Sequence, residues 1–239
     1  MKTYSNGKLY GIGVGPGDPE LITVKAKKIL EQVKYIAVPK TAADKRSLAL
    51  TIAEGIVGAG KKILELLFPM SYDEKLLSES WNDAIVQIRE KLDEGEDVAF
   101  ITLGDPTVYS TYIYMHKVLK QQGYETEIIP GVTSFCASAA RAGISLGENK
   151  ETIAVIPSAY ECENLEEILD TFDNVILMKV SKNFPKLKEC LKNKGLLDKA
   201  VLVSRCGLPD ESLELDVGAV ESGKLSYFTT MIIKKSGVD

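Results

Sequence analysis

The sequence predicts an α/β protein made of two domains. Strand-like apolar runs alternate with helical stretches through the first half of the 239 residues, which is typical of a parallel sheet. This rhythm changes after Gly147. We therefore expect an N-terminal α/β domain with a mostly parallel sheet (residues 1–130) and a C-terminal α/β domain with a smaller mixed sheet (131–239), joined by a short connection.

The N-terminal domain begins with a buried strand at residues 8–15. Asp18 is placed to cap the next helix and Pro19 to take its first position, so that helix should run to about Val33. The other expected elements follow from the apolar period. They are a strand at 35–38, a helix at 46–57, an apolar run at 63–67, an amphipathic helix at 74–92, a strand at 97–103, a helix at 108–121, a strand at 125–129 and a helix at 134–142.

The C-terminal domain is expected to contain strands at 152–157, 174–179 and 199–204, with helices between them. Two further strands are expected at about 211–216 and 227–233. Because only a short connection separates these last two, we expect the second sheet to be mixed.

Composition argues against several classes of protein. A formal charge of −5 disfavours a nucleic-acid-binding protein, although a local group of Lys and Arg can still bind an anionic substrate. The N-terminus has no signal-peptide core, and no stretch is long enough to span a membrane. The four cysteines lack C-x-x-C spacing and His116 is the only histidine, so we expect reduced cytoplasmic thiols and no metal site.

Three loops form the candidate functional site. They span residues 11–18, 104–110 and 130–134, and each follows a strand-like run. Ligands of open α/β sheets bind at the ends of strands, so three such loops in series indicate a binding site.

The first loop is rich in glycine but is not a nucleotide-binding motif. The last position of G-x-G-x-x-G is Pro16 counted from Gly11 and Asp18 counted from Gly13, and no Walker sequence is present. Its four glycines leave the main chain uncovered, so a flat ligand can lie against it. The alternative is a tight turn without a ligand.

The other two loops carry polar groups. Asp105 offers a carboxylate to amine or hydroxyl groups, and Pro106 fixes the turn after Gly104. Thr133 and Ser134 lie at a helix N-terminus, where hydroxyl and N–H groups can meet a carboxylate. In both loops the alternative is simple helix capping.

At these segments the sequence resembles the tetrapyrrole methylases, the class III S-adenosylmethionine-dependent methyltransferases. The resemblance rests on residues 9–21 (LYGIGVGPGDPEL), 104–111 (GDPTVYST) and 129–137 (IPGVTSFCA). The last two segments look most like the branch that methylates carbon 20 of precorrin-2, or of its cobalt form, in cobalamin biosynthesis. The resemblance implies a cytoplasmic homodimer of two-domain α/β chains with the active site in a trough between the domains.

The resemblance also implies which residues bind ligands. The tetrapyrrole would face Gly13, Gly15, Gly17 and Asp18. The residues implied to hold S-adenosylmethionine are Pro16, Gly104, Asp105, Pro106, Val108, Thr133, Ser134, Met178, Cys206, Gly207, Thr229 and Thr230. Those from Met178 onward match by element order, and each of them could instead be a packing or strand residue.

The implied reaction needs alignment more than strong base catalysis, because the tetrapyrrole carbon is already a nucleophile. A weak base could remove the proton afterwards, and Asp105 and Tyr109 are the candidates for this catalytic role. Tyr109 could instead stack on the macrocycle or pack inside. The substrate carboxylates call for cations. Arg46 and Arg141 are the foremost candidates, with Lys40, Lys179, Lys182 and Arg205 as further ones.

Three other functions stay open from the sequence. One is a sibling methyltransferase of the same family that acts at another ring carbon. A second is the diphthine-forming methyltransferase, whose substrate is a protein. The third is a non-catalytic module that binds a nucleotide or effector in the same place. Whether the substrate carries cobalt is also open.

Overall fold

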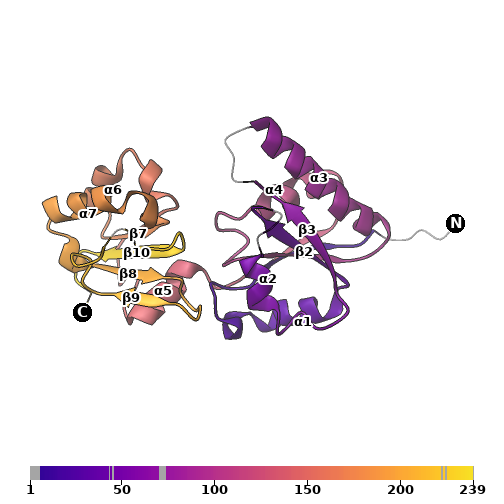
Figure 1. Cartoon of the computed structure of the whole chain (residues 1–239), viewed down its shortest axis with the longest axis horizontal. Coiled ribbons are helices and arrows are strands. Elements are labelled where there is room, and N and C mark those ends of the chain that lie inside the picture. Colours follow the sequence, from indigo (N-terminus) through magenta and orange to yellow (C-terminus); the bar gives the residue numbers. More distant parts are fainter. Residues whose placement is uncertain are drawn as a thin grey trace. The chain divides into compact units, whose positions relative to one another are not determined.

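The computed structural model describes residues 6–42, 44, 46–69, 74–221, 223 and 225–238. The chain forms two compact units, Met1–Thr133 and Ser134–Asp239, coloured indigo to magenta and salmon to yellow in Figure 1. This division lies three residues after the boundary expected from the sequence, and each unit is described by itself. The trough expected between the domains stays a prediction.

The first unit contains a five-stranded sheet in which every described pair of strands is parallel. The strand order is β3-β2-β4-β1-β5. The strands are β1 (Leu9–Gly13), β2 (Tyr35–Lys40), β3 (Lys62–Leu67), β4 (Val98–Thr102) and β5 (Thr126–Ile129). The parallel sheet expected from alternating strands and helices is confirmed, and β4, β1 and β5 lie side by side at one end of the strand order.

The helices of the first unit differ from expectation mainly at their ends. They are α1 (Val24–Gln32), α2 (Leu48–Ala53), α3 (Glu74–Asp93) and α4 (Tyr112–Gln121), with a short 3-10 helix, η1 (Pro19–Leu21). The single helix expected from Pro19 to Val33 is wrong. Asp18 does cap η1, accepting from the N–H of Glu20 at 2.8 Å, but Thr23 is extended and its hydroxyl caps α1 separately. The expected helices at 46–57 and 108–121 are likewise shorter.

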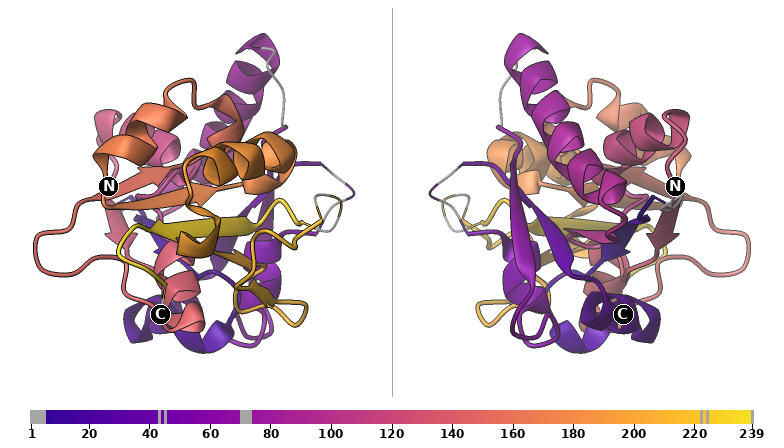
Figure 2. Two further views of the ribbon diagram at one scale, coloured as in Figure 1. Left: turned by 90° about the vertical axis from the view of Figure 1, so that its left-hand side faces the viewer. Right: turned by 90° about the vertical axis from the view of Figure 1, so that its right-hand side faces the viewer.

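One large part of the core of the first unit lies between the sheet and the pair α3 and α4. Figure 2 (right) shows α3 lying across the strands. Phe100 of β4 packs against Tyr112 of α4, with ring centroids 5.7 Å apart, and both are fully buried. A side chain at Gly11 would begin 2.1 Å from the Tyr112 ring. Glycine at this strand position therefore lets α4 approach β1 closely.

The second unit contains a mixed sheet with the order β6-β7-β10-β8-β9. Its strands are β6 (Ile153–Ile156), β7 (Asn174–Met178), β8 (Ala200–Ser204), β9 (Ser212–Glu214) and β10 (Thr229–Lys234). The mixed sheet is confirmed, but the reason given for it is wrong. Residues 215–228 separate β9 from β10, these strands do not pair, and the sheet is mixed because β10 runs antiparallel between β7 and β8.

The helices of the second unit cover both faces of its sheet. They are α5 (Ser134–Ala142), α6 (Leu165–Thr171) and α7 (Phe184–Asn193), with 3-10 helices η2 (Ala159–Glu161), η3 (Val180–Asn183) and η4 (Leu197–Lys199). Side chains alternate along β10, so Met231 and Ile233 pack with α6 and α7 while Ile232 packs with α5. Figures 1 and 2 show α5 on the opposite side of the sheet from α6 and α7.

An ion pair between the buried Lys234 and the exposed Glu148 lies at the end of β10, and no sequence pattern predicted it. The side chain of Lys234 is only 8% exposed. Its Nζ donates to Ser145 Oγ at 2.6 Å and to Glu148 Oε1 at 2.8 Å, and lies 3.5 Å from Glu151 Oε2. The hydrogen bond to Glu148 raises the pKa of Lys234, and the same contact lowers the pKa of Glu148 below its ordinary value of 4.5.

This pair predicts an acid-dependent loss of stability. The folded pKa of Glu148 is depressed, so its contribution is present above pH 4.5 and is lost as the pH falls through the lowered value. We expect Lys234→Met to unfold at a lower temperature than the wild type at neutral pH, and the difference to shrink as the pH falls below 4.5. Thermal unfolding across this range measures it, with the exposed Lys192→Met as a charge-matched control. A difference that stays constant with pH would contradict the prediction.

Within the part of the chain that the structure describes, no helix has the length and apolar content needed to cross a bilayer.

Candidate functional site

In the first unit the three loops that the sequence singled out meet. They follow β4, β1 and β5, which are adjacent parallel strands, so their carboxyl ends lie at one edge of the sheet. The first two loops are joined by a pair of main-chain hydrogen bonds, from Gly104 N to Gly15 O at 2.8 Å and from Gly15 N to Gly104 O at 3.3 Å. Both glycines have positive φ angles, +77° at Gly15 and +69° at Gly104.

Backbone packing explains two other glycines at this edge. A Cβ atom at Gly131 would lie 2.2 Å from Gly104 O, and one at Gly13 would lie 2.5 Å from the same oxygen and 2.7 Å from the Gly131 backbone. On the side where a Cβ would lie, the main chain at Gly13 is therefore covered, and contact of Gly13 with a ligand stays a prediction. Neighbouring backbone fills that space, and the glycine serves the close approach of the three loops.

Asp105 joins the second loop to the third. Its Oδ1 accepts from the Thr107 N–H at 2.7 Å and from the Thr107 hydroxyl at 2.5 Å, while its Oδ2 accepts from the Gly131 N–H at 2.9 Å. The side chain is buried. Both carboxylate oxygens are thus used within the protein, which gives Asp105 a positioning role.

Tyr109 has an unusual backbone conformation for a bulky residue. Its φ angle is +51° and its side chain is 58% exposed. Ser110 follows it and accepts from the Tyr112 N–H at 3.2 Å, while its Oγ lies 2.9 Å from Thr102 Oγ1. This turn is why α4 begins at Tyr112 rather than at residue 108. Left-handed backbone at a non-glycine residue costs about 1–2 kcal/mol and is concentrated at functional sites.

The third loop presents an unsatisfied hydroxyl. Thr133 Oγ1 is buried and has no hydrogen-bond partner among the described residues. Ser134, the next residue, begins the nine-residue helix α5, whose first N–H groups have no partner within the helix. An unsatisfied hydroxyl beside a helix N-terminus can hydrogen bond to a polar ligand.

In the second unit, the residues expected near the cofactor lie at one sheet edge. Met178 ends β7 and is paired in register with Thr230, and Ser204 ends β8 and is paired with Thr229. The Thr229 hydroxyl donates to Ser226 O at 2.6 Å, and its oxygen lies 3.0 Å from Ser204 Oγ.

The loop after β8 adds two further expected residues, Cys206 and Gly207. Gly207 has a φ angle of +78° and Cys206 is buried, which raises the pKa of its thiol. Left-handed backbone recurs here at Lys179 (φ +58°) after β7 and at Arg205 (φ +53°) after β8. Left-handed backbone at non-glycine residues thus occurs at Tyr109 after β4 in the first unit and at Lys179 and Arg205 in the second.

Comparison with known proteins identifies the family. The family model of the tetrapyrrole (corrin/porphyrin) methylases matches residues 8–219. The chain belongs to this family. It is 41% identical over 207 residues to a protein of Methanocaldococcus jannaschii named as a probable cobalt-precorrin-2 C(20)-methyltransferase, covering 86% of both chains. It is 36% identical to the cobalt-precorrin-2 C(20)-methyltransferase of Salmonella typhimurium, covering 96% of this chain and 97% of that one.

A solved structure supports the assignment to this family. The cobalt precorrin-4 methyltransferase matches with a TM-score of 0.75 and 25% identity, over 97% of this chain and 96% of that one. The two-sheet α/β fold expected for this tetrapyrrole methylase is confirmed.

The remaining residues of the first loop are mostly enclosed in this methylase. Gly15, Pro16 and Gly17 are buried, and Asp18 is committed to capping η1. In the second loop Pro106 is buried and Val108 is half-buried. The ligand contacts assigned to these residues stay predictions.

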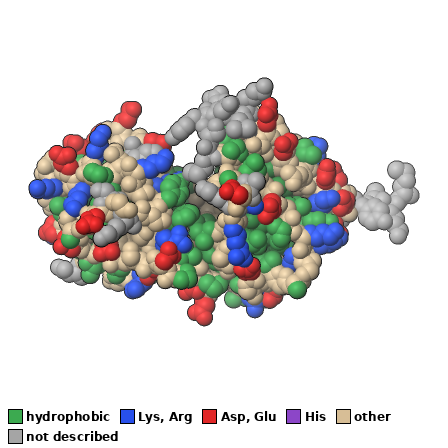
Figure 3. All heavy atoms as spheres, viewed as in Figure 1, with side chains coloured by type: hydrophobic (Ala, Val, Ile, Leu, Met, Phe, Trp, Pro, Cys, Tyr) green, Lys and Arg blue, Asp and Glu red, His purple; other side chains and the backbone are tan. Residues whose placement is uncertain are grey.

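The candidate cations of the methylase are mostly paired with carboxylates. Arg46 pairs with Glu54 and Arg141 with Glu211. Lys40 lies 3.0 Å from Glu65, and Arg205 lies 2.5 Å from Asp210. On the face shown in Figure 3, Lys and Arg side chains are interspersed with Asp and Glu side chains. Arg46 and Arg141, the two cations favoured from sequence, would each have to exchange a protein carboxylate for that of a substrate.

Sequence reasoning missed Glu211, which organises the loop after β8. Its Oε2 accepts from the Gly207 N–H at 2.7 Å and its Oε1 accepts from Arg141. Burial opposes ionisation, but the Gly207 N–H and Arg141 hold the pKa of Glu211 below its ordinary value. A single glutamate in a loop carries no sequence signal: its contact with Gly207 is local but follows no recognised motif, and Arg141 lies 70 residues away along the chain.

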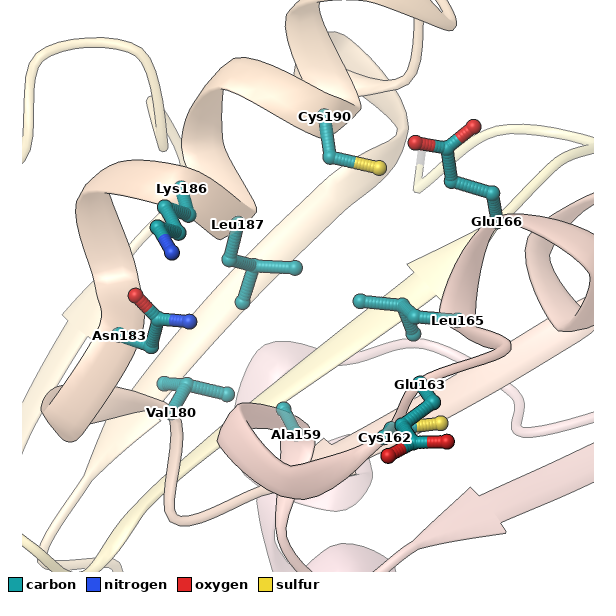
Figure 4. Close-up of a pocket in the computed structure, with 10 residues that line it drawn as sticks. All are labelled: Ala159, Cys162, Glu163, Leu165, Glu166, Val180, Asn183, Lys186, Leu187 and Cys190. Carbon is teal, nitrogen blue, oxygen red and sulfur yellow. The ribbon is translucent and has the colours of Figure 1, made fainter.

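The second unit also contains a cavity of about 230 Å³ between η2, α6, η3 and α7 (Figure 4). Its floor is apolar, with Ala159, Leu165, Val180 and Leu187. Burial, with the nearby Glu166 carboxylate, raises the pKa of the Cys190 thiol at its wall. A protonated thiol is a poor nucleophile, and none of the predicted ligand-binding residues lines this cavity.

Proposed function

We propose that this chain transfers a methyl group from S-adenosylmethionine to carbon 20 of cobalt-precorrin-2, or of metal-free precorrin-2, in cobalamin biosynthesis. The observation that carries the proposal is the similarity, over most of the chain, to two proteins named for this reaction. The meeting of the loops at Gly13, Gly104 and Gly131 supports it, because it provides a fixed main-chain surface beside polar groups.

The residues present fit a zwitterionic, partly apolar cofactor. The buried Thr133 hydroxyl lacks a partner among the described side chains and can donate to it. Gly104, Pro106, Val108 and Ser134 of the two neighbouring loops would hold it, together with Met178, Cys206, Gly207, Thr229 and Thr230 of the second unit. When bound, S-adenosylmethionine supplies an electrophilic methyl group on a sulfonium.

The chain's own residues have the task of alignment. Fixing two reactants in line and excluding water can remove several kcal/mol from a barrier, about 7–11 kcal/mol in favourable cases. Asp105 contributes by fixing the second loop on the third. Tyr109, whose side chain is exposed, is proposed to contact the macrocycle, by stacking on it or by accepting the proton released after methyl transfer.

The assembly and location that we propose are a homodimer in the cytoplasm. Light scattering of the purified protein tests the first part of this proposal, and fractionation of the cells that make it tests the second.

Product analysis tests the activity. The purified chain is incubated with S-adenosylmethionine labelled at the methyl carbon and with precorrin-2, with and without cobalt. We expect one label per tetrapyrrole by mass spectrometry, located at carbon 20 by NMR. Label at another carbon would indicate a sibling methyltransferase. Binding of S-adenosylhomocysteine without any labelled product would indicate a binding module.

Tyr109→Gly is expected to separate stability from activity. Glycine relieves the left-handed backbone, so the free energy of unfolding should stay the same or rise by up to about 1 kcal/mol. Methyl transfer should fall, because the exposed ring is lost. Urea unfolding and steady-state kinetics measure the two effects. Asn149→Gly, at another positive φ angle (+49°) in an exposed loop, is the control and should leave activity unchanged. Full activity in Tyr109→Gly would remove any functional role of the ring.

A further inference from the structure

Lys179 differs from the other candidate cations. It directly follows β7, beside the Met178–Thr230 pair at the strand edge of the second unit. Four of the six candidates pair with carboxylates, and a fifth, Lys182, has other interactions. Lys179 forms no ion pair with any carboxylate that the structure describes. Its charge is therefore not already neutralised by the described part of the protein.

The conformation of Lys179 holds its charge at this edge. Its backbone has a φ angle of +58°, and its Nζ lies 5.5 Å from the centroid of the Tyr227 ring. Residue 179 precedes η3, but its side chain makes no capping hydrogen bond. A lysine in this conformation costs stability that glycine would not, and neither a cap nor an ion pair with the described residues compensates for it.

The segment that carries Tyr227, the aromatic partner of Lys179, is held in place by a hydrogen bond and a ring contact. Arg205 N donates to Phe228 O at 2.9 Å, which ties the loop after β8 to the segment that carries Tyr227. The Tyr227 ring meets Phe228 edge-on, with centroids 5.4 Å apart. The aromatic partner of Lys179 is thus held in place, and Lys179 itself is a half-buried residue.

From these observations we infer that Lys179 is a specificity-determining residue that binds a carboxylate of the ligand at this edge. The inference rests on the proposed function, because a tetrapyrrole with acetate and propionate side chains is a polyanion. The carboxylate of the methyl donor has the same chemistry, and the experiment distinguishes the two sources. Arg46 and Arg141 are not needed for this contact, since each already pairs with a glutamate.

The test uses binding by the full-length chain, so that it does not depend on turnover. Lys179→Met removes the charge, and Lys179→Gly removes it while favouring the observed backbone conformation. Lys179→Arg restores a cation. Lys192→Met, an exposed lysine of α7, is matched for the loss of one positive charge. The probes are cobalt-precorrin-2 and its methyl-esterified form, then S-adenosylhomocysteine and 5′-methylthioadenosine, which lacks the carboxylate.

We expect Lys179→Met and Lys179→Gly to weaken binding of cobalt-precorrin-2 about tenfold, as for a hydrogen bond to a charged group, and Lys179→Arg to recover most of it. Binding of the esterified tetrapyrrole should not change. Weaker binding of S-adenosylhomocysteine, with 5′-methylthioadenosine unaffected, would support the inference with the donor as the source of the carboxylate.

Two results would overturn the inference. One is an effect no larger than that of Lys192→Met on both charged ligands. The other is an equal loss for ligands with and without carboxylates, which would indicate a structural role. A wild-type chain that binds these ligands but transfers no methyl group would refute the proposed function and leave the result on Lys179 standing. A wild-type chain that binds neither ligand would refute both.

Discussion

Gly131→Ala is expected to destabilise the first unit by about 2–3 kcal/mol and to abolish binding of S-adenosylhomocysteine. The new methyl group would lie 2.2 Å from Gly104 O and 2.8 Å from the Gly13 backbone. Neither neighbour is the end of a flexible side chain, so the loops themselves must separate. Overpacking of this kind typically costs about 1–3 kcal/mol of stability. Because the loops are hydrogen bonded to one another, we expect the cost of Gly131→Ala to lie at the upper end of this range.

Two measurements check this prediction, urea unfolding for stability and calorimetry for ligand binding. Gly55→Ala is the matched control, because a Cβ at Gly55 meets nothing within 4 Å and its φ angle is not positive. That substitution should be neutral, or stabilise by about 0.4–1 kcal/mol through the unfolded state. If Gly131→Ala bound S-adenosylhomocysteine as the wild type does, the close packing of the three loops would not be required for the site.

The elements around this glycine show what the sequence could predict. The three loops were found because Gly, Pro and Asp follow apolar runs, and parallel strands place such loops at one edge. The cap at Asp18 could also be predicted, because it depends on a contact with Glu20, two residues along the chain. The role of Gly13 was not, since the atoms that cover it belong to residues 104 and 131, far along the chain.

Helix ends and the topology of the second sheet were harder to predict from the sequence, because they too depend on contacts between residues far apart along the chain. The turn at Tyr109 depends on Ser110 meeting both Thr102 and the start of α4, which no local propensity describes. The place of β10 between β7 and β8 depends on which strands bury Met231 and Ile233 together. Periodicity shows that these residues are strand-like, but it does not select their neighbours.

Asp105→Asn is expected to distinguish a positioning role from base catalysis. The amide keeps one acceptor oxygen and replaces the other with an NH2 group, which only donates. Its side chain can therefore accept from Thr107 or from the Gly131 N–H, but not from both. Leaving a part-buried donor without its partner costs about 1–3 kcal/mol. Because the third loop is then held less firmly, we expect the Kd of S-adenosylhomocysteine to rise about tenfold or more.

The two roles differ in what happens at saturating cofactor. For a positioning residue, kcat should fall less than the affinity does, and the pH dependence of kcat should keep its shape. Loss of a general base would instead reduce kcat by about 10²–10⁴-fold with the affinity unchanged, and would alter the pH profile. Thr107→Val removes only the 2.5 Å hydroxyl contact to Asp105, so it should weaken binding in the same direction but by less. If Asp105→Asn lost turnover while binding S-adenosylhomocysteine normally, Asp105 would be the catalytic base. Its three hydrogen bonds from the protein would then not prevent it from accepting a proton.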